Sequence, residues 1–196
     1  MQVSADLLRT DKAVLKWLEQ TRSLMALVGG ILSIIQPELY ELGLRAFDQL
    51  AGDPTLVTTP ADDLLNVLQH WAAPFNAMSV ISNRETPIHH DVGSRPAWSD
   101  LLLALGEYED GCLEVPVLGI VYQYNPGTMV AFSGCAFSHG AKCVGNRACI
   151  AWYMRDNVMK RLGLPLCSWA DVNSLVPRYD AYEAQDNSWM FYDLVA

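Results

Sequence analysis

Residues 86–91 read Thr86-Pro87-Ile88-His89-His90-Asp91 and lie in the β-rich half of the chain. Their composition predicts a short strand over residues 87–91. Successive side chains of a strand point to opposite faces, so His89 and Asp91 project together while His90 points away. One imidazole and one carboxylate on the same face are two of the three side chains of a facial metal-binding triad.

This stretch belongs to a series of strand-like runs that begins at Ala77. The runs cover residues 78–82, 87–91, 111–115, 119–124, 129–132 and 148–154. A strong turn signal, Asn125-Pro126-Gly127, separates two of them. Residues 98–105 are compatible with either a short helix or a buried run. Several short strands that close on themselves predict a β-sandwich or jelly-roll barrel with helices packed outside, an α+β fold.

The segments on either side of the strands differ from them in pattern. Apolar residues recur at helical spacing over 7–18 and 39–50, and a third helix is expected after Pro60, while Gly29-Gly30 is expected to interrupt the helical region. The end of the chain is irregular and rich in aromatic residues, so we expect it to wrap the body. The predicted organisation is a single domain over 1–196, with a helical scaffold over 1–75, a barrel core over 76–160 and an aromatic-rich wrap over 161–196.

Composition narrows the classes of function. The 196 residues are 51% hydrophobic and 18% charged, which favours one folded domain. The longest apolar run near the start, residues 24–35, is shorter than the roughly 20 residues that cross a bilayer. No targeting signal is recognised, so we expect an intracellular protein with no membrane partner. The five cysteines form no close CxxC pair, which excludes zinc-ribbon and thioredoxin-like sites and favours reduced thiols.

A complete triad needs a second imidazole, and His139 is the candidate, 48 residues beyond Asp91. Two histidines and one carboxylate leave the remaining metal positions open, as in non-haem Fe(II) oxygenases, where a bidentate co-substrate and O₂ occupy them. Arg147 follows at the head of a strand, and its planar fork suits the far carboxylate of a 2-oxo acid. Cys149 shares its face, and Arg84 is a second candidate for the same pocket.

Each of these residues also has a simpler interpretation when it is taken alone. His89 is equally well explained as a hydrogen-bonded structural histidine. A surface ion pair is the commoner fate of an arginine such as Arg147. The triad interpretation therefore depends on His89, Asp91, His139 and Arg147 being considered together.

The segment from Ser79 to Val158 resembles the TET/JBP-like family of dioxygenases, in the compact form found in fungi. The motifs that carry this resemblance are Asn83-Arg84-Glu85-Thr86-Pro87-Ile88-His89-His90-Asp91, Leu118-Gly119, Tyr124-Asn125-Pro126-Gly127-Thr128, Ser138-His139-Gly140, Arg147 and Ala151-Trp152-Tyr153-Met154-Arg155-Asp156. The resemblance implies a double-stranded β-helix that uses Fe(II), 2-oxoglutarate and O₂ to oxidise the methyl group of 5-methylcytosine in nucleic acid, stepwise toward 5-carboxylcytosine.

The resemblance also implies roles for individual residues. His89, Asp91 and His139 would be the iron ligands. Arg147, with Cys149 and with assistance from Arg84, would hold 2-oxoglutarate. Family members commonly carry arginine at the position of His90, so a contact to the substrate or to a loop is altered here.

The net charge of the chain affects whether nucleic acid is a plausible partner. The net charge of −9 opposes binding of nucleic acid by bulk attraction. Residues 84–161, however, carry seven basic and eight acidic side chains and are nearly neutral. A local groove is expected from Arg84, Arg95, Lys142, Arg155, Lys160 and Arg161.

The leading function is therefore oxidation of 5-methylcytosine in DNA, to 5-hydroxymethylcytosine and further to the 5-formyl and 5-carboxyl forms. Such a protein would be nuclear and is expected to be helped by an accessory DNA-binding partner. The alternatives are a 2-oxoglutarate-dependent hydroxylase of another methylated base, a small molecule or a protein side chain, and an inactive binding module.

Overall fold

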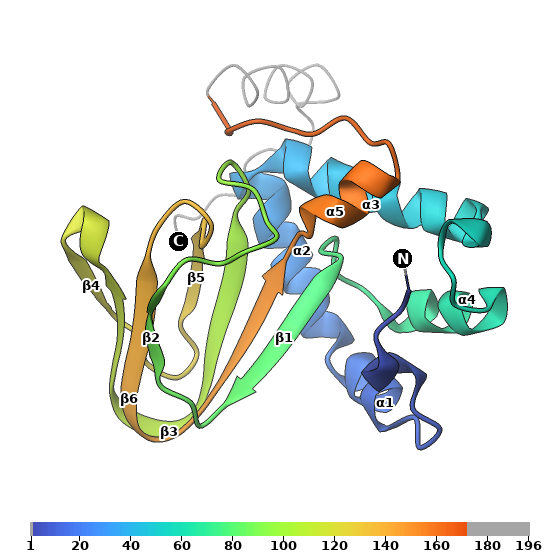
Figure 1. The fold of residues 1–196 in the computed structure, drawn as a ribbon. Helices are drawn as coiled ribbons and strands as arrows, with labels where there is room; N and C mark the ends of the chain where they lie inside the picture. The colour runs from blue at the N-terminus through green and yellow to red at the C-terminus, as the bar shows by residue number, and fades with distance from the viewer. Residues whose placement is uncertain (1, 172–196) are drawn as a thin grey trace, which may run out of the picture.

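The computed structural model describes residues 2–171 and combines a β-barrel with a layer of helices (Figure 1). The helices precede the barrel in sequence, apart from the short η3 within it and α5 that follows it. Their bounds are η1 Ala5–Leu8, α1 Ala13–Gln20, α2 Arg22–Ile35, α3 Pro37–Gly52, η2 Pro54–Leu56, α4 Ala61–His70, η3 Pro116–Leu118 and α5 Asp156–Arg161. The strands are β1 Ala77–Ser82, β2 Thr86–His89, β3 Asp100–Val115, β4 Ile120–Gln123, β5 Met129–Phe132 and β6 His139–Tyr153.

Two long strands, β3 and β6, pair antiparallel along their length and organise the barrel. The first half of β3 and the second half of β6 are flanked by β5 and β1. The other halves are flanked by β4 and β2. The chain therefore forms two four-stranded halves that share β3 and β6, which is the predicted double-stranded β-helix.

Glycines allow the two long strands to bend between these halves. Gly106 of β3 has a backbone φ of +122° and Gly145 of β6 has a φ of +118°. Residues other than glycine rarely adopt these values. The register of the pairing also shifts between Glu109 and Cys112, as in a β-bulge. The bend lies beside Arg147, which pairs with Gly106.

Residues 98–105 do not form a helix. From Asp100 onward they are the first half of β3, in which Leu101 and Leu103 face the helices and Ala104 faces the barrel interior. A strand covered on both faces is apolar at nearly every position, so it lacks the alternation that distinguishes a strand from a helix in sequence.

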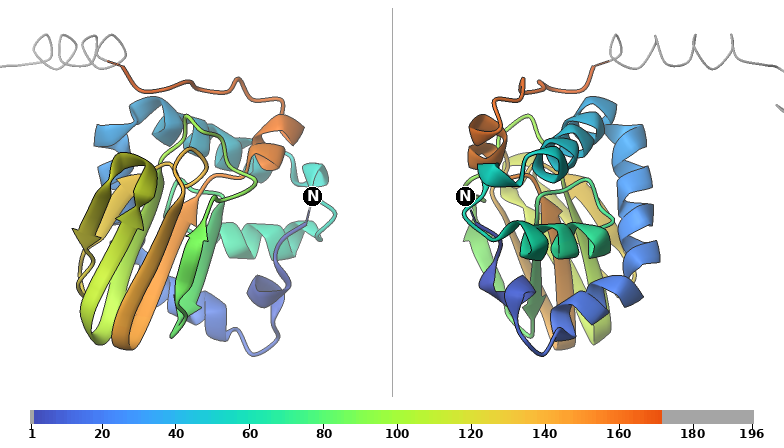
Figure 2. Two further views of the ribbon diagram at one scale, coloured as in Figure 1. Left: turned by 60° about the vertical axis from the view of Figure 1, so that its left-hand side comes forward. Right: turned by 90° about the vertical axis from the view of Figure 1, so that its right-hand side faces the viewer.

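The helices cover the outer face of the β1–β6–β3 half of the barrel (Figure 2). Trp98, Trp152 and Phe75 lie in this core together with residues of α2 and α3. The expected interruption at Gly29-Gly30 is wrong, because both glycines lie inside α2. Gly29 is buried, and a Cβ there would lie 3.1 Å from Pro74, so this glycine allows close packing rather than a turn.

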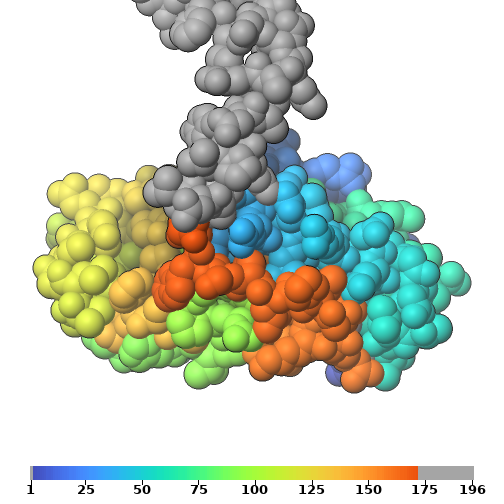
Figure 3. Space-filling model, turned by 90° about the horizontal axis from the view of Figure 1, so that it is seen from above, coloured from blue at the N-terminus to red at the C-terminus, as the bar shows by residue number. Residues whose placement is uncertain are grey.

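The chain beyond the barrel begins with α5, whose last turn contains Lys160 and Arg161. Residues 162–171 then lie on the helical layer (Figure 3). The Trp98 indole N–H donates to the carbonyl of Cys167 at 3.2 Å. The rest of the predicted aromatic wrap, residues 172–196, is outside the described residues.

Within residues 2–171, no single helix is long and apolar enough to cross a membrane. The bent pair of α1 and α2, at 60° to each other, passes this test together by length and composition.

Candidate metal centre

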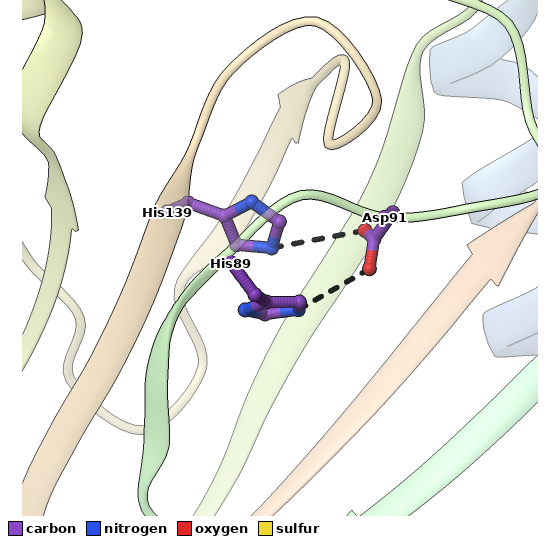
Figure 4. Close-up of side chains that lie close together, drawn as sticks. All are labelled: His89, Asp91 and His139. Carbon is purple, nitrogen blue, oxygen red and sulfur yellow. Dashed lines mark ion pairs between the residues drawn. The ribbon is translucent and has the colours of Figure 1, made fainter.

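Three predicted ligand residues meet at one end of the barrel (Figure 4). His89 ends β2, Asp91 follows it in the next loop, and His139 begins β6 directly opposite His89 in the β2–β6 register. The Nε2 atoms of His89 and His139 lie 3.3 Å and 3.7 Å from the two carboxylate oxygens of Asp91. The ligand atoms of all three residues lie within 4.8 Å of one another. This spacing suits three ligands on one face of a single ion.

Both histidines are held by the ring nitrogen that faces away from Asp91. Nδ1 of His89 lies 2.9 Å from the carbonyl of Pro87, and Nδ1 of His139 lies 3.1 Å from the carbonyl of Phe137. A proton on Nδ1 donates to each carbonyl and leaves Nε2 as the free lone pair. Burial also lowers the pKa of His139, which favours the neutral imidazole that a metal requires.

The carboxylate of Asp91 is positioned by a turn from another part of the chain. The Asp91 N–H donates to the carbonyl of Gly134 at 2.9 Å, and the Gly134 N–H donates to Oδ2 of Asp100 at 3.1 Å. A Cβ on Gly134 would collide with the carboxyl group of Asp91 and crowd that of Asp100. Burial raises the pKa of Asp100 to about 7. This turn therefore fixes Asp91 through contacts that its H-x-D motif does not contain.

Arg147 lines one cavity together with His89, Asp91 and His139, on the inner face of β6. It is 3% exposed, yet within residues 2–171 no carboxylate lies within ion-pairing distance of its guanidinium. Nη2 donates to the carbonyl of Arg84 at 3.0 Å, and the guanidinium lies 5.9 Å from the centre of the Tyr124 ring. A buried cation without a counter-ion is costly, so this arrangement is suited to an anionic ligand.

The other predicted residues differ in how they take part. Cys149 is buried in the same cavity, where the Tyr124 hydroxyl lies 3.5 Å from its Sγ and burial raises the pKa of its thiol. The side chain of Arg84 is exposed and is not part of the cavity wall, so its observed contact is made by its backbone. His90 is exposed, with Nδ1 3.3 Å from the carbonyl of Cys135.

Comparison with known proteins agrees with this geometry. The Tet_JBP family model, described as the oxygenase domain of the 2OGFeDO superfamily, matches residues 5–156. The chain belongs to this family. A solved structure of NgTET1 in complex with 5mC DNA has the same fold, with a TM-score of 0.56 and 15% sequence identity. The alignment covers 91% of this chain and 63% of that one, and no curated protein matches in sequence.

Membership of the 2OGFeDO superfamily makes the protein an Fe(II)- and 2-oxoglutarate-dependent dioxygenase, with O₂ as the second substrate. The described residues fit these groups. Two imidazole nitrogens and one carboxylate are the ligand set typical of a non-haem Fe(II) centre, and their ligand atoms lie close enough together to share one ion. The Arg147 guanidinium, which has no carboxylate partner among residues 2–171, lies in the same cavity, as a dianionic co-substrate requires.

Sequence reasoning did not assign the residues that support the site. Tyr124 appeared only as part of a turn motif, although its ring lies under Arg147. Phe132 packs edge-on against His139, with ring centres 4.8 Å apart. Asp100 and Gly134 come from two further segments. The one signal for Asp100 in the sequence is its place next to an apolar run. An acidic residue in such a run is notable because buried carboxylates are rare without a structural reason.

Proposed function

We propose that this dioxygenase oxidises the methyl group of 5-methylcytosine in DNA, first to 5-hydroxymethylcytosine and then to the 5-formyl and 5-carboxyl forms. The observation that carries the proposal is the joint placement of His89, Asp91, His139 and Arg147 around one cavity, in a chain of the Tet_JBP family. The fold shared with NgTET1 in complex with 5mC DNA supports the choice of substrate.

In this proposal each residue has a defined task. His89, Asp91 and His139 hold Fe(II), which supplies activation of O₂ and oxidation of a C–H bond. The guanidinium of Arg147 binds the far carboxylate of the co-substrate through a bidentate pair of hydrogen bonds. Tyr124 lies beneath that guanidinium and limits its movement. Cys149, as a neutral thiol, closes the wall beside it.

The barrel also controls access to the centre. His139 is 4% exposed and the Asp91–Gly134–Asp100 contacts are largely internal, whereas His89 and Asp91 are partly exposed. Substrate therefore approaches from the side of His89 and Asp91. A base in duplex DNA must leave the stack to reach them, at a cost of a few kcal/mol.

The distribution of basic side chains favours modest affinity for DNA. Among the expected groove residues, Arg95 and Lys160 both pair with Asp156, at 3.2 Å and 2.5 Å, and Lys142 pairs with Glu114 at 3.1 Å. Few free cations mean few phosphate contacts and binding that weakens strongly with salt. An accessory DNA-binding partner is part of the proposal for this reason, and nuclear localisation is part of it because the proposed substrate is DNA.

The decisive experiment incubates the Fe(II)-loaded protein with 2-oxoglutarate and 5-methylcytosine oligonucleotides, single- and double-stranded, at low and moderate salt. Mass spectrometry of the digested DNA should detect 5-hydroxymethylcytosine, and succinate should form in step with it. Asp91→Ala is the matched control, since it removes one ligand, and it should abolish both products.

The same experiment distinguishes DNA from the main alternative class of substrate. The net charge of −9 favours a substrate other than DNA, such as a small molecule or a protein side chain. Succinate formation that responds to a metabolite or peptide library, without any oxidised base, would refute the DNA proposal and support that alternative.

A further inference from the structure

The inner face of β4 lies beside Leu113, a residue of the cavity wall, and is open to solvent. Side chains of directly paired residues in antiparallel strands point to the same face. Leu113 lines the cavity and pairs with Tyr122 on one side and with Ala141 on the other. Tyr122 therefore points to the same face as the cavity, and Ile120, two residues earlier, does so as well.

The next residue on this face confirms the direction. Tyr124, two positions beyond Tyr122, has its ring under Arg147 and its hydroxyl beside Cys149. The alternate positions Ile120, Tyr122 and Tyr124 thus follow one face of the strand from the metal end inward. Tyr124 is 1% exposed, whereas Tyr122 is 40% exposed.

The exposed part of this face is suited to a planar group with little charge. β4 is the strand at the edge of the barrel farthest from the helices, and within the described residues no strand pairs with its outer side (Figure 1). Ile120 and Tyr122 offer an aliphatic surface and a phenol ring, without a charge that would attract the dianionic co-substrate. Aromatic side chains stack on bases of any sequence.

The distance between Tyr122 and the strand that carries His139 is compatible with contact to a single nucleobase ring. Tyr122 is two strands away from β6, and neighbouring strands lie about 4.8 Å apart, so roughly 10 Å separate it from the strand that carries His139. Tyr122 therefore lies within reach of a planar group that also approaches the metal ligands.

We propose that Tyr122 is a substrate-positioning residue whose exposed ring contacts the methylated nucleobase at the mouth of the metal cavity. The inference rests on the proposed oxidation of 5-methylcytosine. It assigns the ring, rather than the hydroxyl, as the part that contacts the base.

The test compares three variants of the Fe(II)-loaded enzyme. Tyr122→Ala removes the ring, Tyr122→Phe keeps the ring without its hydroxyl, and Val121→Ala shortens the neighbouring side chain, which points to the opposite face and is 65% exposed. Three quantities are measured for each variant: kcat/KM on a single-stranded 5-methylcytosine oligonucleotide, the Michaelis constant for the co-substrate 2-oxoglutarate, and the succinate formed without DNA.

Tyr122→Ala is expected to lower kcat/KM for DNA at least tenfold, mainly through KM, with both co-substrate readouts within twofold of wild type. Tyr122→Phe and Val121→Ala should stay within threefold of wild type in all readouts. Unchanged DNA oxidation by Tyr122→Ala would overturn the inference and leave the proposed function standing. A matching rise in the Michaelis constant for the co-substrate would also overturn it, since Tyr122 would then serve 2-oxoglutarate.

Failure of the proposed function gives a different result. Wild-type enzyme that forms succinate but no oxidised base would refute 5-methylcytosine as the substrate, and this role of Tyr122 with it.

Discussion

Replacing Arg147 tests the proposed co-substrate site most directly. Its buried guanidinium donates to the Arg84 carbonyl and lies over Tyr124, with no carboxylate partner among residues 2–171. A carboxylate bound bidentately would add two charge-assisted hydrogen bonds, each worth about 1.5–3 kcal/mol. Arg147→Met removes the charge and the donors, so it should cost about 3 kcal/mol of binding and raise the Kd for 2-oxoglutarate about 100-fold.

The same change should leave the ligand-free protein about as stable as wild type. Removing an unpaired buried charge relieves its desolvation cost, and an apolar side chain of similar length fills the space. The lost hydrogen bond to the Arg84 carbonyl costs about 1 kcal/mol in the other direction. Thermal unfolding without 2-oxoglutarate should therefore show a midpoint equal to that of wild type or higher, while stabilisation by added 2-oxoglutarate should disappear.

The assay is a calorimetric titration in which 2-oxoglutarate is added to protein loaded with Mn(II) in place of Fe(II). Arg84→Ala is the matched control, because it removes an arginine side chain but keeps the backbone carbonyl that Arg147 contacts. Its Kd should lie within about threefold of wild type. The reasoning is refuted if Arg147→Met binds as tightly as wild type, or if Arg84→Ala weakens binding more than Arg147→Met does.

Three further changes test the supporting structure. Gly134→Ala places a methyl group against the carboxyl group of Asp91, so Mn(II) affinity measured by calorimetry should fall about tenfold, and an unchanged affinity would contradict the packing. The pKa of Asp100 is raised by burial to about 7, above the unfolded value of about 3.9, so the metal-free protein should lose stability as pH rises from about 4 to 7. Asp100→Asn should flatten this dependence in thermal unfolding followed at several pH values, and parallel curves for the two proteins would show that another group is responsible. Gly30→Ala meets no atom within 4 Å inside α2, so it should raise the free energy of unfolding by about 0.5–1 kcal/mol in urea denaturation, whereas a decrease would argue against a helix there.

Part of the candidate metal centre was predictable because its H-x-D motif is local. The H-x-D spacing predicted that His89 and Asp91 come together, but the expected strand over residues 87–91 is too long: β2 ends at His89, and Asp91 is held in the following loop by Gly134. His139 and Arg147 have the same parity, eight residues apart. They lie on the inner face of one strand, β6, although the sequence suggested that Arg147 headed a separate strand.

The less accurate predictions involve segments whose environment is set by distant parts of the chain. The first half of β3 has no alternation, because helices cover one face and the barrel interior the other. Gly29-Gly30 resembles a break in sequence, but Pro74 packs against Gly29 and the helix continues. In both cases tertiary packing outweighs local propensity.

The sequence by itself determined which side chains are available for the chemistry, and it placed His89 and Asp91 close together in one short motif. Only the tertiary structure decided what holds and surrounds that chemistry. Asp100 and Gly134 reach Asp91, and Tyr122 comes to lie beside Leu113 of the cavity wall, through contacts between segments far apart in the chain. Such contacts depend on strand register and on the bends at Gly106 and Gly145, which set where two distant strands meet and which the periodicity of either strand does not contain.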